Sequence, residues 1–191
     1  MSIEAIPTEI DGCYELRPQV RADARGTFVK TFHREWFEEL GLQADWAEQY
    51  YSVSRKGVLR GLHFQLPPHD HAKLVYCTAG VVLDVAVDLR RGSPTYGRHV
   101  TVSLDASRGN LVYIASGLAH GFYTLSDSAT MVYNVSSVYS ESHDSGILWS
   151  SAGIAWPDRE PLLSERDRSF VALGEFDSPF EFTQDAPSVP R

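Results

Sequence analysis

Alternating hydrophobic and polar positions are the main pattern of this chain. The clearest case is Val81–Leu89, where aliphatic residues occupy the odd positions and the even positions carry Val82, Asp84, Ala86 and Asp88. A period of two places one set of side chains on each face of a β-strand. Similar runs, bounded by turn signals such as Gly92-Ser93-Pro94, predict strands at Gly26–Phe32, Gln49–Ser54, Val58–Gln65, Lys73–Thr78, Arg98–Leu104, Leu111–Ile114 and Thr130–Tyr139.

Only one stretch has the clear pattern of a helix. Within Arg34–Leu40, the residues Trp36, Phe37 and Leu40 fall on one side, and Gly41 ends the pattern. Many short strands with so little helix predict an all-β fold, a sandwich or barrel of the jelly-roll kind with a few short helices.

The length and composition fit one compact domain. A chain of 191 residues that is 43% hydrophobic can bury a substantial core without dividing. We expect this domain to cover residues 1–173. From about Gly174 onward the chain is acidic, contains prolines and has no period, which predicts a poorly ordered C-terminal tail over residues 174–191.

Charge and the N-terminal sequence exclude several classes of protein. The formal net charge is -8 and no basic run is present, so nucleic acid is not an expected partner. The N-terminus lacks the basic start and apolar core of a signal peptide, and no apolar stretch approaches the roughly 18 residues of a membrane span. Two cysteines, Cys13 and Cys77, make no zinc pattern. Together these features predict a protein of the reduced cytoplasm without a membrane segment.

Arg60 and His63 are the first candidates for chemistry. They stand among apolar neighbours in a predicted strand, where an ionisable pair needs a partner or a purpose. A core histidine beside a surface arginine is the simpler interpretation. Strict alternation also places the two on opposite faces, so they can share a pocket only if the strand is bulged, for which Gly61 is suited.

Lys73 and Asp84 lie in two strongly apolar strands. Such residues are usually exposed on a sheet face, but if they point inward they mark a polar cavity inside a barrel. Similar alternatives apply to three further residues. His120, after Ser116-Gly117, is predicted to sit where a strand enters a turn and could face a barrel mouth; Tyr133 could be core packing; Asp167 lies three residues after Ser164, as in a helix cap.

The histidines also allow a metal-site hypothesis. The imidazoles of His63, His69, His71 and His120 would suffice, and the spacing of His69 and His71 occurs in metal-binding β-barrels. Those barrels usually add a glutamate shortly afterwards, whereas this chain has Lys73, a cation, in that region. We therefore expect no bound metal.

Several ordered segments together resemble the dTDP-4-dehydrorhamnose 3,5-epimerase family. The resemblance spans roughly Gly12 to Phe170 and continues through Tyr133, Tyr139 and Trp156-Pro157. So many segments in one order are far more specific than any single motif. They are Asp23–Phe28, Gly57–Gln65, Lys73–Val75, Asp84–Arg90, Ser93–Gly97, Ala119–Phe122 and Ser164–Asp167.

The resemblance implies a cupin-type jelly roll without metal, usually a homodimer, that acts on a nucleotide-diphosphate 4-keto-6-deoxy sugar. The ketone acidifies the hydrogens on carbons 3 and 5, so a base can remove one if the enolate oxygen is stabilised, and no cofactor is needed. By the family's pattern His63 is the base, Asp167 its partner, Lys73 the cation beside the enolate and Tyr133 the acid on the opposite face. A second histidine–carboxylate pair supports them, formed by His120 and Asp84.

The same resemblance implies the substrate-binding residues. Arg60 would grip the diphosphate, and Arg25, Phe28 and Tyr139 would hold the nucleotide. Gln65 lies in the same motif as Arg60 and is predicted to bind substrate with them. The departures lie near the expected nucleotide: this chain has Lys30 where glutamate is common, and Glu48-Gln49-Tyr50 where Gln-x-Asn is common.

Those departures bear on specificity. Lys30 and Glu48 could pair with each other, and with Tyr50 they could suit a base other than thymine, such as cytosine. Two smaller departures are Asn134, where lysine commonly follows the tyrosine, and Ala115, where proline is common. Asn134 adjoins the predicted acid and could affect which carbons are epimerised.

The sequence thus predicts an epimerase of carbons 3 and 5 in deoxysugar or surface-polysaccharide synthesis. An epimerase of one carbon alone, acting on a CDP-linked sugar, is the nearest alternative. A sugar-binding barrel without turnover and a metal-dependent cupin oxygenase are alternatives from other classes.

Overall fold

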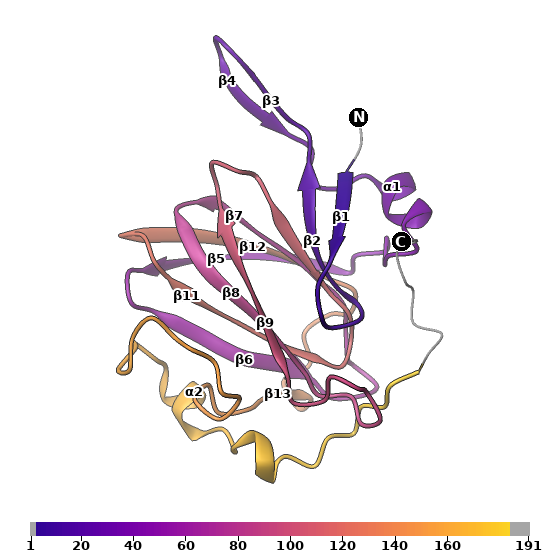
Figure 1. Cartoon of the computed structure of the whole chain (residues 1–191), viewed down its shortest axis with the longest axis vertical. Helices are drawn as coiled ribbons and strands as arrows, with labels where there is room; N and C mark the ends of the chain where they lie inside the picture. The colour runs from indigo at the N-terminus through magenta and orange to yellow at the C-terminus, as the bar shows by residue number, and fades with distance from the viewer. Residues whose placement is uncertain (1–2, 184–191) are drawn as a thin grey trace.

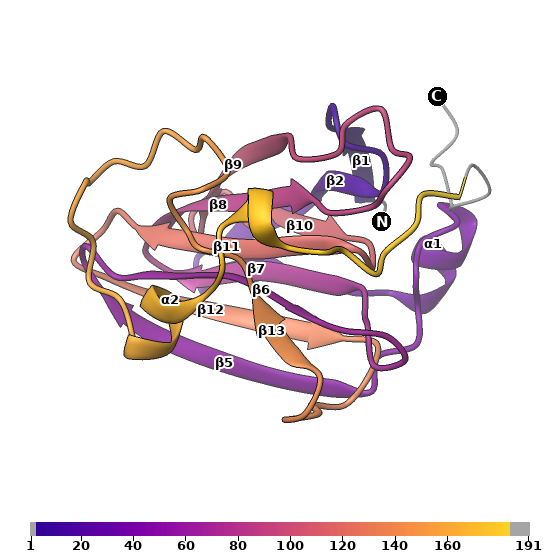
Figure 2. The ribbon, with the colours of Figure 1, turned by 90° about the horizontal axis from the view of Figure 1, so that it is seen from below.

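The computed structural model describes residues 3–183, and its main elements are two antiparallel β-sheets that face each other (Figures 1 and 2). The first sheet has the strand order β1 (Ile3–Pro7), β2 (Cys13–Pro18), β10 (Leu111–Ile114), β7 (Lys73–Ala79), β12 (Ser128–Val135), β5 (Glu48–Arg55). The second has the order β13 (Asp144–Gly146), β6 (Leu59–Gln65), β11 (Leu118–Thr124), β8 (Val81–Asp88), β9 (His99–Asp105). The predicted all-β jelly roll is confirmed.

A separate hairpin and two short helices complete the described elements. Strands β3 (Val20–Asp23) and β4 (Gly26–Val29) pair only with each other, and the hairpin projects away from the barrel (Figure 1). Helix α1 (Arg34–Glu39) agrees with the predicted helix, and helix α2 (Glu165–Ser169) begins after Ser164. A single 3-10 turn follows at Leu173–Glu175.

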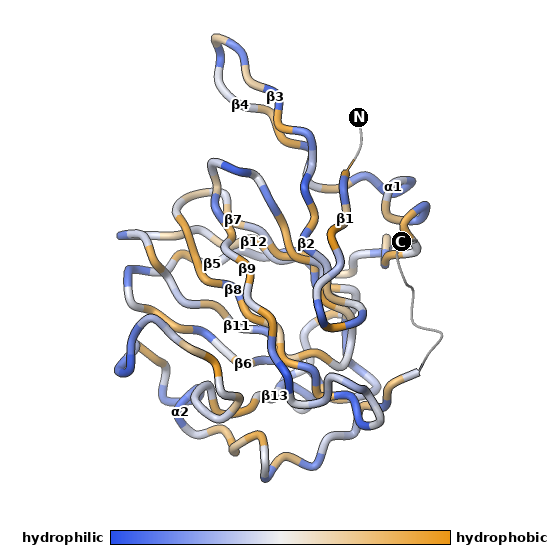
Figure 3. Tube along the Cα trace, in the orientation of Figure 1, coloured by the Kyte–Doolittle hydropathy of each residue, from blue (hydrophilic) through white to orange (hydrophobic). Residues whose placement is uncertain are grey.

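Strand β8 has the predicted alternation, and both of its faces are buried. Val82 and Ala86 belong to the core between the two sheets, so Asp84, which shares their face, points into the barrel. The aliphatic face, with Val85 and Val87, packs against the segment that follows β13. Figure 3 shows hydrophobic residues following these central strands through the body of the molecule.

The predicted poorly ordered tail is wrong for residues 174–183. Phe180 is only 5% exposed and packs with Val87 and Leu89 on the aliphatic side of the second sheet. The backbone of Arg91 donates to the carbonyl of Phe180 and accepts from the amide of Phe182, at 2.9 Å in each case. The segment is packed because the outer face of β8 needs an apolar cover. Residues 184–191 of the predicted tail lie outside the described residues.

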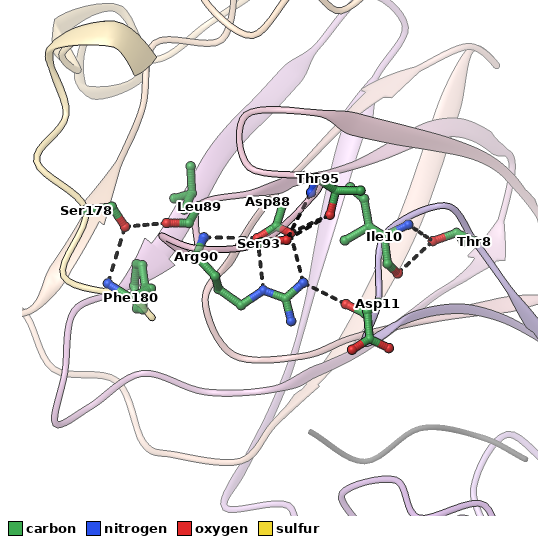
Figure 4. Close-up of polar contacts among 10 residues, drawn as sticks. All are labelled: Thr8, Ile10, Asp11, Asp88, Leu89, Arg90, Ser93, Thr95, Ser178 and Phe180. Carbon is green, nitrogen blue, oxygen red and sulfur yellow. Dashed lines mark hydrogen bonds and ion pairs between the residues drawn. The ribbon is translucent and has the colours of Figure 1, made fainter. Parts of the chain in front are cut away.

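A buried ion pair fixes the end of β8 (Figure 4). The carboxylate of Asp88 accepts hydrogen bonds from the Arg90 guanidinium at 2.9 and 3.0 Å, from Ser93 at 2.6 Å and from Thr95 at 2.7 Å. Arg90 also donates to the carbonyl of Asp11 at 2.8 Å. These bonds join β8, the loop after it and the N-terminal segment, so Asp88 has a structural role.

Candidate active site

A cavity of about 340 Å³ lies between the two sheets. It is lined by residues of β5, β7 and β12 of the first sheet, by residues of β6, β11 and β13 of the second, and by residues of α2 and the loops at its mouth. Most predicted site residues line it: Glu48, Tyr50, Arg60, His63, Gln65, Lys73, His120, Tyr133 and Tyr139. The wider groove of about 740 Å³ near Arg90 and Pro179 contains neither histidine–carboxylate pair.

A bulge in β6 brings Arg60 and His63 into one cavity. The pairing with β11 shifts between His120, opposite His63, and Phe122, opposite Arg60. Gly61 has φ +144, and a Cβ there would lie 2.6 Å from the Cα of Gly121. Only glycine fits this position. The strand is therefore bulged, as it must be if Arg60 and His63 are to share a pocket.

His63 and Asp167 form the first histidine–carboxylate pair. His63 Nε2 lies 2.8 Å from Asp167 Oδ1, and Asp167 Oδ2 accepts from the amide of Gly61 at 3.2 Å. Ser164 does cap helix α2, since its hydroxyl accepts from the amide of Asp167 at 3.1 Å. Because the cap uses the backbone amide of Asp167, the carboxylate is free to hydrogen-bond His63. This hydrogen bond keeps a proton on Nε2 of His63 and leaves Nδ1 as a proton acceptor.

The pKa values of this pair suit a base. Burial opposes ionisation of Asp167, but its hydrogen bonds with His63, Gly61 and Ser164, together with the charge that His63 carries when protonated, hold the pKa of Asp167 below its ordinary value. Burial lowers the pKa of His63, against the opposing effect of Asp167. A neutral His63 beside an ionised Asp167 can take up a proton at neutral pH.

His120 and Asp84 form the second pair, deeper in the barrel. His120 lies within strand β11 and not in a turn, so the prediction of a turn position is wrong. Its Nε2 is 2.8 Å from Asp84 Oδ2, and both side chains are buried. Burial raises the pKa of Asp84 although His120 and Lys73 oppose the shift.

Lys73 reaches across the cavity from the first sheet to the second. The side chain is buried, and its ammonium donates to the carbonyl of His63 at 3.2 Å. Burial lowers the pKa of Lys73 to about 8, against the attraction of Asp144 and Asp84. The ammonium is thus a buried positive charge at the cavity, where it acts strongly on nearby charge.

Tyr133 approaches the cavity from strand β12, on the side opposite His63. Its ring stacks on Tyr50 with the centroids 4.8 Å apart, and its hydroxyl is 3.4 Å from Ser52 Oγ. Burial raises the pKa of Tyr133 far above its ordinary value, so the phenol keeps its proton. A histidine on one sheet therefore shares the cavity with a phenol on the other.

One group of predicted binding residues lies at the cavity. Arg60 is held by Ser54, whose hydroxyl accepts from Nε at 3.0 Å, and Glu48 accepts from the amide of Tyr139 at 2.7 Å. Both lie at the cavity, as does Gln65. The amide group of Gln65 is occupied by the chain itself: its nitrogen donates to the carbonyl of His69 at 2.8 Å and its oxygen accepts from the amide of Ser140 at 2.6 Å.

Three predicted binding residues do not reach the cavity of their own chain. Arg25 and Phe28 are exposed on the projecting hairpin, where Arg25 pairs with Asp23. The ammonium of Lys30 lies over the ring of Trp36, 5.4 Å from its centroid. Among the ion pairs of residues 3–183, none joins Lys30 to Glu48, so the expected pairing is wrong.

The cavity also contains residues that the sequence did not single out. Ser52, two positions from Tyr50 and on the same strand face, could have been found from the period of β5. Arg166 donates to Asp144 at 2.9 Å at the mouth, and no pattern in the sequence indicated this contact. Asn134 faces away from the cavity and accepts from Gln49 at 2.6 Å.

The histidines of the metal hypothesis do not form a metal site in the described residues. His69 packs against His143, with ring centroids 4.3 Å apart, whereas His71 contacts Ser137 at 3.1 Å. Over residues 3–183, no group of three or more His, Cys, Asp and Glu side chains is arranged to hold a metal ion. Within the same part of the chain, no helix is long and apolar enough to cross a membrane.

A jelly-roll barrel whose cavity is lined by a carboxylate-paired histidine on one sheet and a phenol and a lysine on the other has the features of a class of acid–base epimerases. The comparisons with known proteins agree. The model of the dTDP-4-dehydrorhamnose 3,5-epimerase family matches residues 7–175, and the chain belongs to this family. It is an isomerase by its family.

Relatives and solved structures are similar over most of the chain. A dTDP-4-dehydrorhamnose 3,5-epimerase of Shigella flexneri is 45% identical over 86% of this chain and 93% of the relative. A dTDP-4-dehydrorhamnose 3-epimerase of Streptomyces niveus is 42% identical over 88% of this chain and 83% of the relative. The structure of dTDP-6-deoxy-D-glucose-3,5-epimerase from Legionella pneumophila, in complex with dTDP-4-keto-L-rhamnose, has a TM-score of 0.90 at 35% identity and covers 95% of this chain and 99% of that one.

Proposed function

We propose that this enzyme inverts carbons 3 and 5 of a dTDP-linked 4-keto-6-deoxyhexose by removing and returning protons. One observation carries the proposal: His63 and Tyr133 face each other from different sheets across one cavity, and Lys73 joins the two sides. Inversion requires that a proton leaves one face of a carbon and another arrives on the opposite face. The names of the relatives and of the ligand-bound neighbour support the class of substrate.

The roles follow from the geometry. Nδ1 of His63 takes the proton beside the ketone while Asp167 stabilises the imidazolium. The charge that develops on the ketone oxygen is stabilised by the ammonium of Lys73, with His120 and Asp84 supporting the deep end of the cavity. Tyr133 then donates its proton from the other side. Because hydrogen moves only as a proton, the reaction needs no redox cofactor.

The substrate's diphosphate would bind at the mouth of the cavity. Arg60 presents its planar guanidinium there, held by Ser54, and can make paired hydrogen bonds to phosphate oxygens. Tyr139 and Tyr50 are partly exposed aromatic surfaces beside it, where a nucleobase can stack. Glu48, which holds the amide of Tyr139, completes this edge.

We further propose a homodimer in the cytoplasm. The β3–β4 hairpin carries Arg25 and Phe28, the latter 55% exposed, away from the barrel (Figure 1). A second copy of the chain could receive both residues at its own cavity. Both cysteines are free, which suits a reducing compartment. Mixing a His63→Ala chain with an Arg25→Ala/Phe28→Ala chain should restore activity if the hairpin serves the partner's site, and should not if it serves its own.

Proton NMR in heavy water tests the reaction. Chelator-treated enzyme would be given dTDP-4-keto-6-deoxyglucose and, in a separate sample, its CDP counterpart, with the signals at carbons 3 and 5 followed. Exchange and inversion at both carbons are expected with the dTDP sugar. Exchange at one carbon would make the enzyme a single-site epimerase, like the 3-epimerase relative. Folded enzyme that exchanges neither carbon with either sugar would refute the proposal.

A further inference from the structure

Strand β5 places two side chains against Tyr133. Tyr50 and Tyr133 are register partners on β5 and β12, and their rings lie nearly parallel, with an interplanar angle of 17°. Ser52, two residues further along the same face, reaches the Tyr133 hydroxyl at 3.4 Å. The intervening Tyr51 points outward and is 70% exposed. One face of an edge strand thus contacts both the ring and the hydroxyl of the proposed acid.

A second ring also contacts Tyr133. The His120 ring meets it edge to face, with centroids 6.0 Å apart and an interplanar angle of 71°. His120 is itself held by Asp84. A tyrosine side chain has only two rotatable bonds before its hydroxyl, so a stacked ring, an edge contact with a second ring and a hydrogen bond at the hydroxyl leave it little freedom.

We infer that Tyr50 and Ser52 are positioning residues that hold the Tyr133 hydroxyl over the enolate. They thereby decide whether a deprotonated carbon is reprotonated with inversion or with retention. The inference rests on the proposed function. It assigns Tyr50 a task beyond the nucleotide contact expected from the sequence, because the ring that lines the cavity also covers Tyr133.

The chemistry shows why position matters. When a C–H bond beside the ketone breaks, the proton goes to His63 and the electron pair moves into the enolate. The enolate can regain a proton from His63 on the same face, which restores the substrate. It can instead form a C–H bond with the proton of Tyr133 on the opposite face, which leaves a phenolate and gives the inverted carbon. The phenolate is reprotonated from water, and His63 loses its proton to water.

These two outcomes can be counted separately in heavy water. Once His63 has exchanged its proton with solvent, return from His63 gives deuterium without inversion, whereas delivery from Tyr133 gives inversion. The number of inversions per exchange therefore measures the placement of Tyr133 and does not depend on how much enzyme is active. A general loss of structure lowers both rates together and leaves the ratio unchanged.

The test compares Tyr50→Ala, Tyr50→Phe and Ser52→Ala with the wild-type enzyme. Loss of the stacked ring in Tyr50→Ala should lower inversions per exchange about fivefold, whatever the change in the exchange rate itself. Tyr50→Phe retains the ring and should restore the ratio to within about twofold. Ser52→Ala removes one hydrogen bond and should lower it about threefold. Tyr51→Leu, on the outer face of β5, is the matched control for the strand.

Either of two results would overturn the inference. One is an unchanged ratio in both Tyr50→Ala and Ser52→Ala; the other is a rise in KM for Tyr50→Ala with the ratio unchanged, which would make Tyr50 a binding residue alone. If Tyr50→Ala does not fold by circular dichroism, Ser52→Ala decides the question. Failure of the proposed function looks different, because the wild-type enzyme would then show neither exchange nor inversion.

Discussion

Replacement of Lys73 by methionine should stabilise the protein while it destroys activity. The pKa of Lys73 falls from 10.5 to about 8 on burial, which corresponds to a cost of about 3 kcal/mol for keeping the ammonium charged in the folded state at neutral pH. Methionine fills a similar volume without a charge. It also removes the hydrogen bond to the carbonyl of His63, worth about 1 kcal/mol. A net gain of about 2 kcal/mol in the free energy of unfolding at pH 7 is expected.

The gain should depend on pH in a defined direction. The unfolded chain keeps Lys73 protonated up to about its ordinary pKa, whereas the folded protein releases the proton near pH 8. Between pH 8 and 10.5 the unfolded state binds more protons, so the stability of the wild-type protein rises with pH relative to the variant. The advantage of Lys73→Met is therefore full below pH 8 and disappears by pH 10.5.

Urea unfolding at fixed protein concentration, followed from pH 7 to 10.5, measures this effect. In thermal unfolding at pH 7, the melting temperature of Lys73→Met should be about 4–8 °C above that of the wild type. Lys56→Met, at an exposed turn, is the control and should show no such pH dependence. A variant less stable than the wild type at pH 7, or a difference that does not change with pH, would refute the reasoning that the ammonium is held at the expense of stability.

Three further predictions follow from the site and its supports. The pH profile of kcat/KM should fall on the acid side, below the ordinary histidine pKa, as His63 becomes protonated, and on the alkaline side near pH 8 as Lys73 loses its charge; an alkaline limb near 10 would contradict the role of burial. Asp167→Asn should lower the epimerisation rate about 10²- to 10⁴-fold with KM little changed, because the imidazole loses its charged partner. Steady-state kinetics measures this, and a fall in kcat of less than tenfold would remove Asp167 from the mechanism. Asp88→Ala should cost about 3–5 kcal/mol by urea unfolding, because it leaves the buried Arg90 unpaired, and a cost below 1 kcal/mol would show that the pair is dispensable.

The alternation of the sequence predicted the central strands because each has two faces with different chemistry. Strand β8 is the best example: with a period of two, one face is aliphatic throughout and the other carries both carboxylates. The same rule correctly required a bulge at Gly61 if Arg60 and His63 share a pocket. What a period of two can show is the face of each residue, and not which neighbour covers that face.

Strand β11 shows where this reasoning fails. Every residue of Leu118–Thr124 is buried, because the strand lies in the middle of its sheet with the cavity on one side and a packed layer on the other. With no exposed face there is no alternation to detect, and His120 was assigned to a turn. The packed segment after Gly174 was missed because it has too few apolar residues to make a pattern. Phe176 and Phe180 pack against partners that lie far away in the sequence.

Burial, and not the type of residue, separates the two histidine–carboxylate pairs. Both have a distance of 2.8 Å between Nε2 and a carboxylate oxygen. The side chain of His63 is 27% exposed and that of His120 only 4%. Asp167 also accepts the amide of Gly61, and its pKa is lowered, whereas burial raises the pKa of Asp84. Because a base must have a stable charged partner and a route for its proton to water, this difference supports the proposal that His63 is the base and that His120 supports the deep end of the cavity.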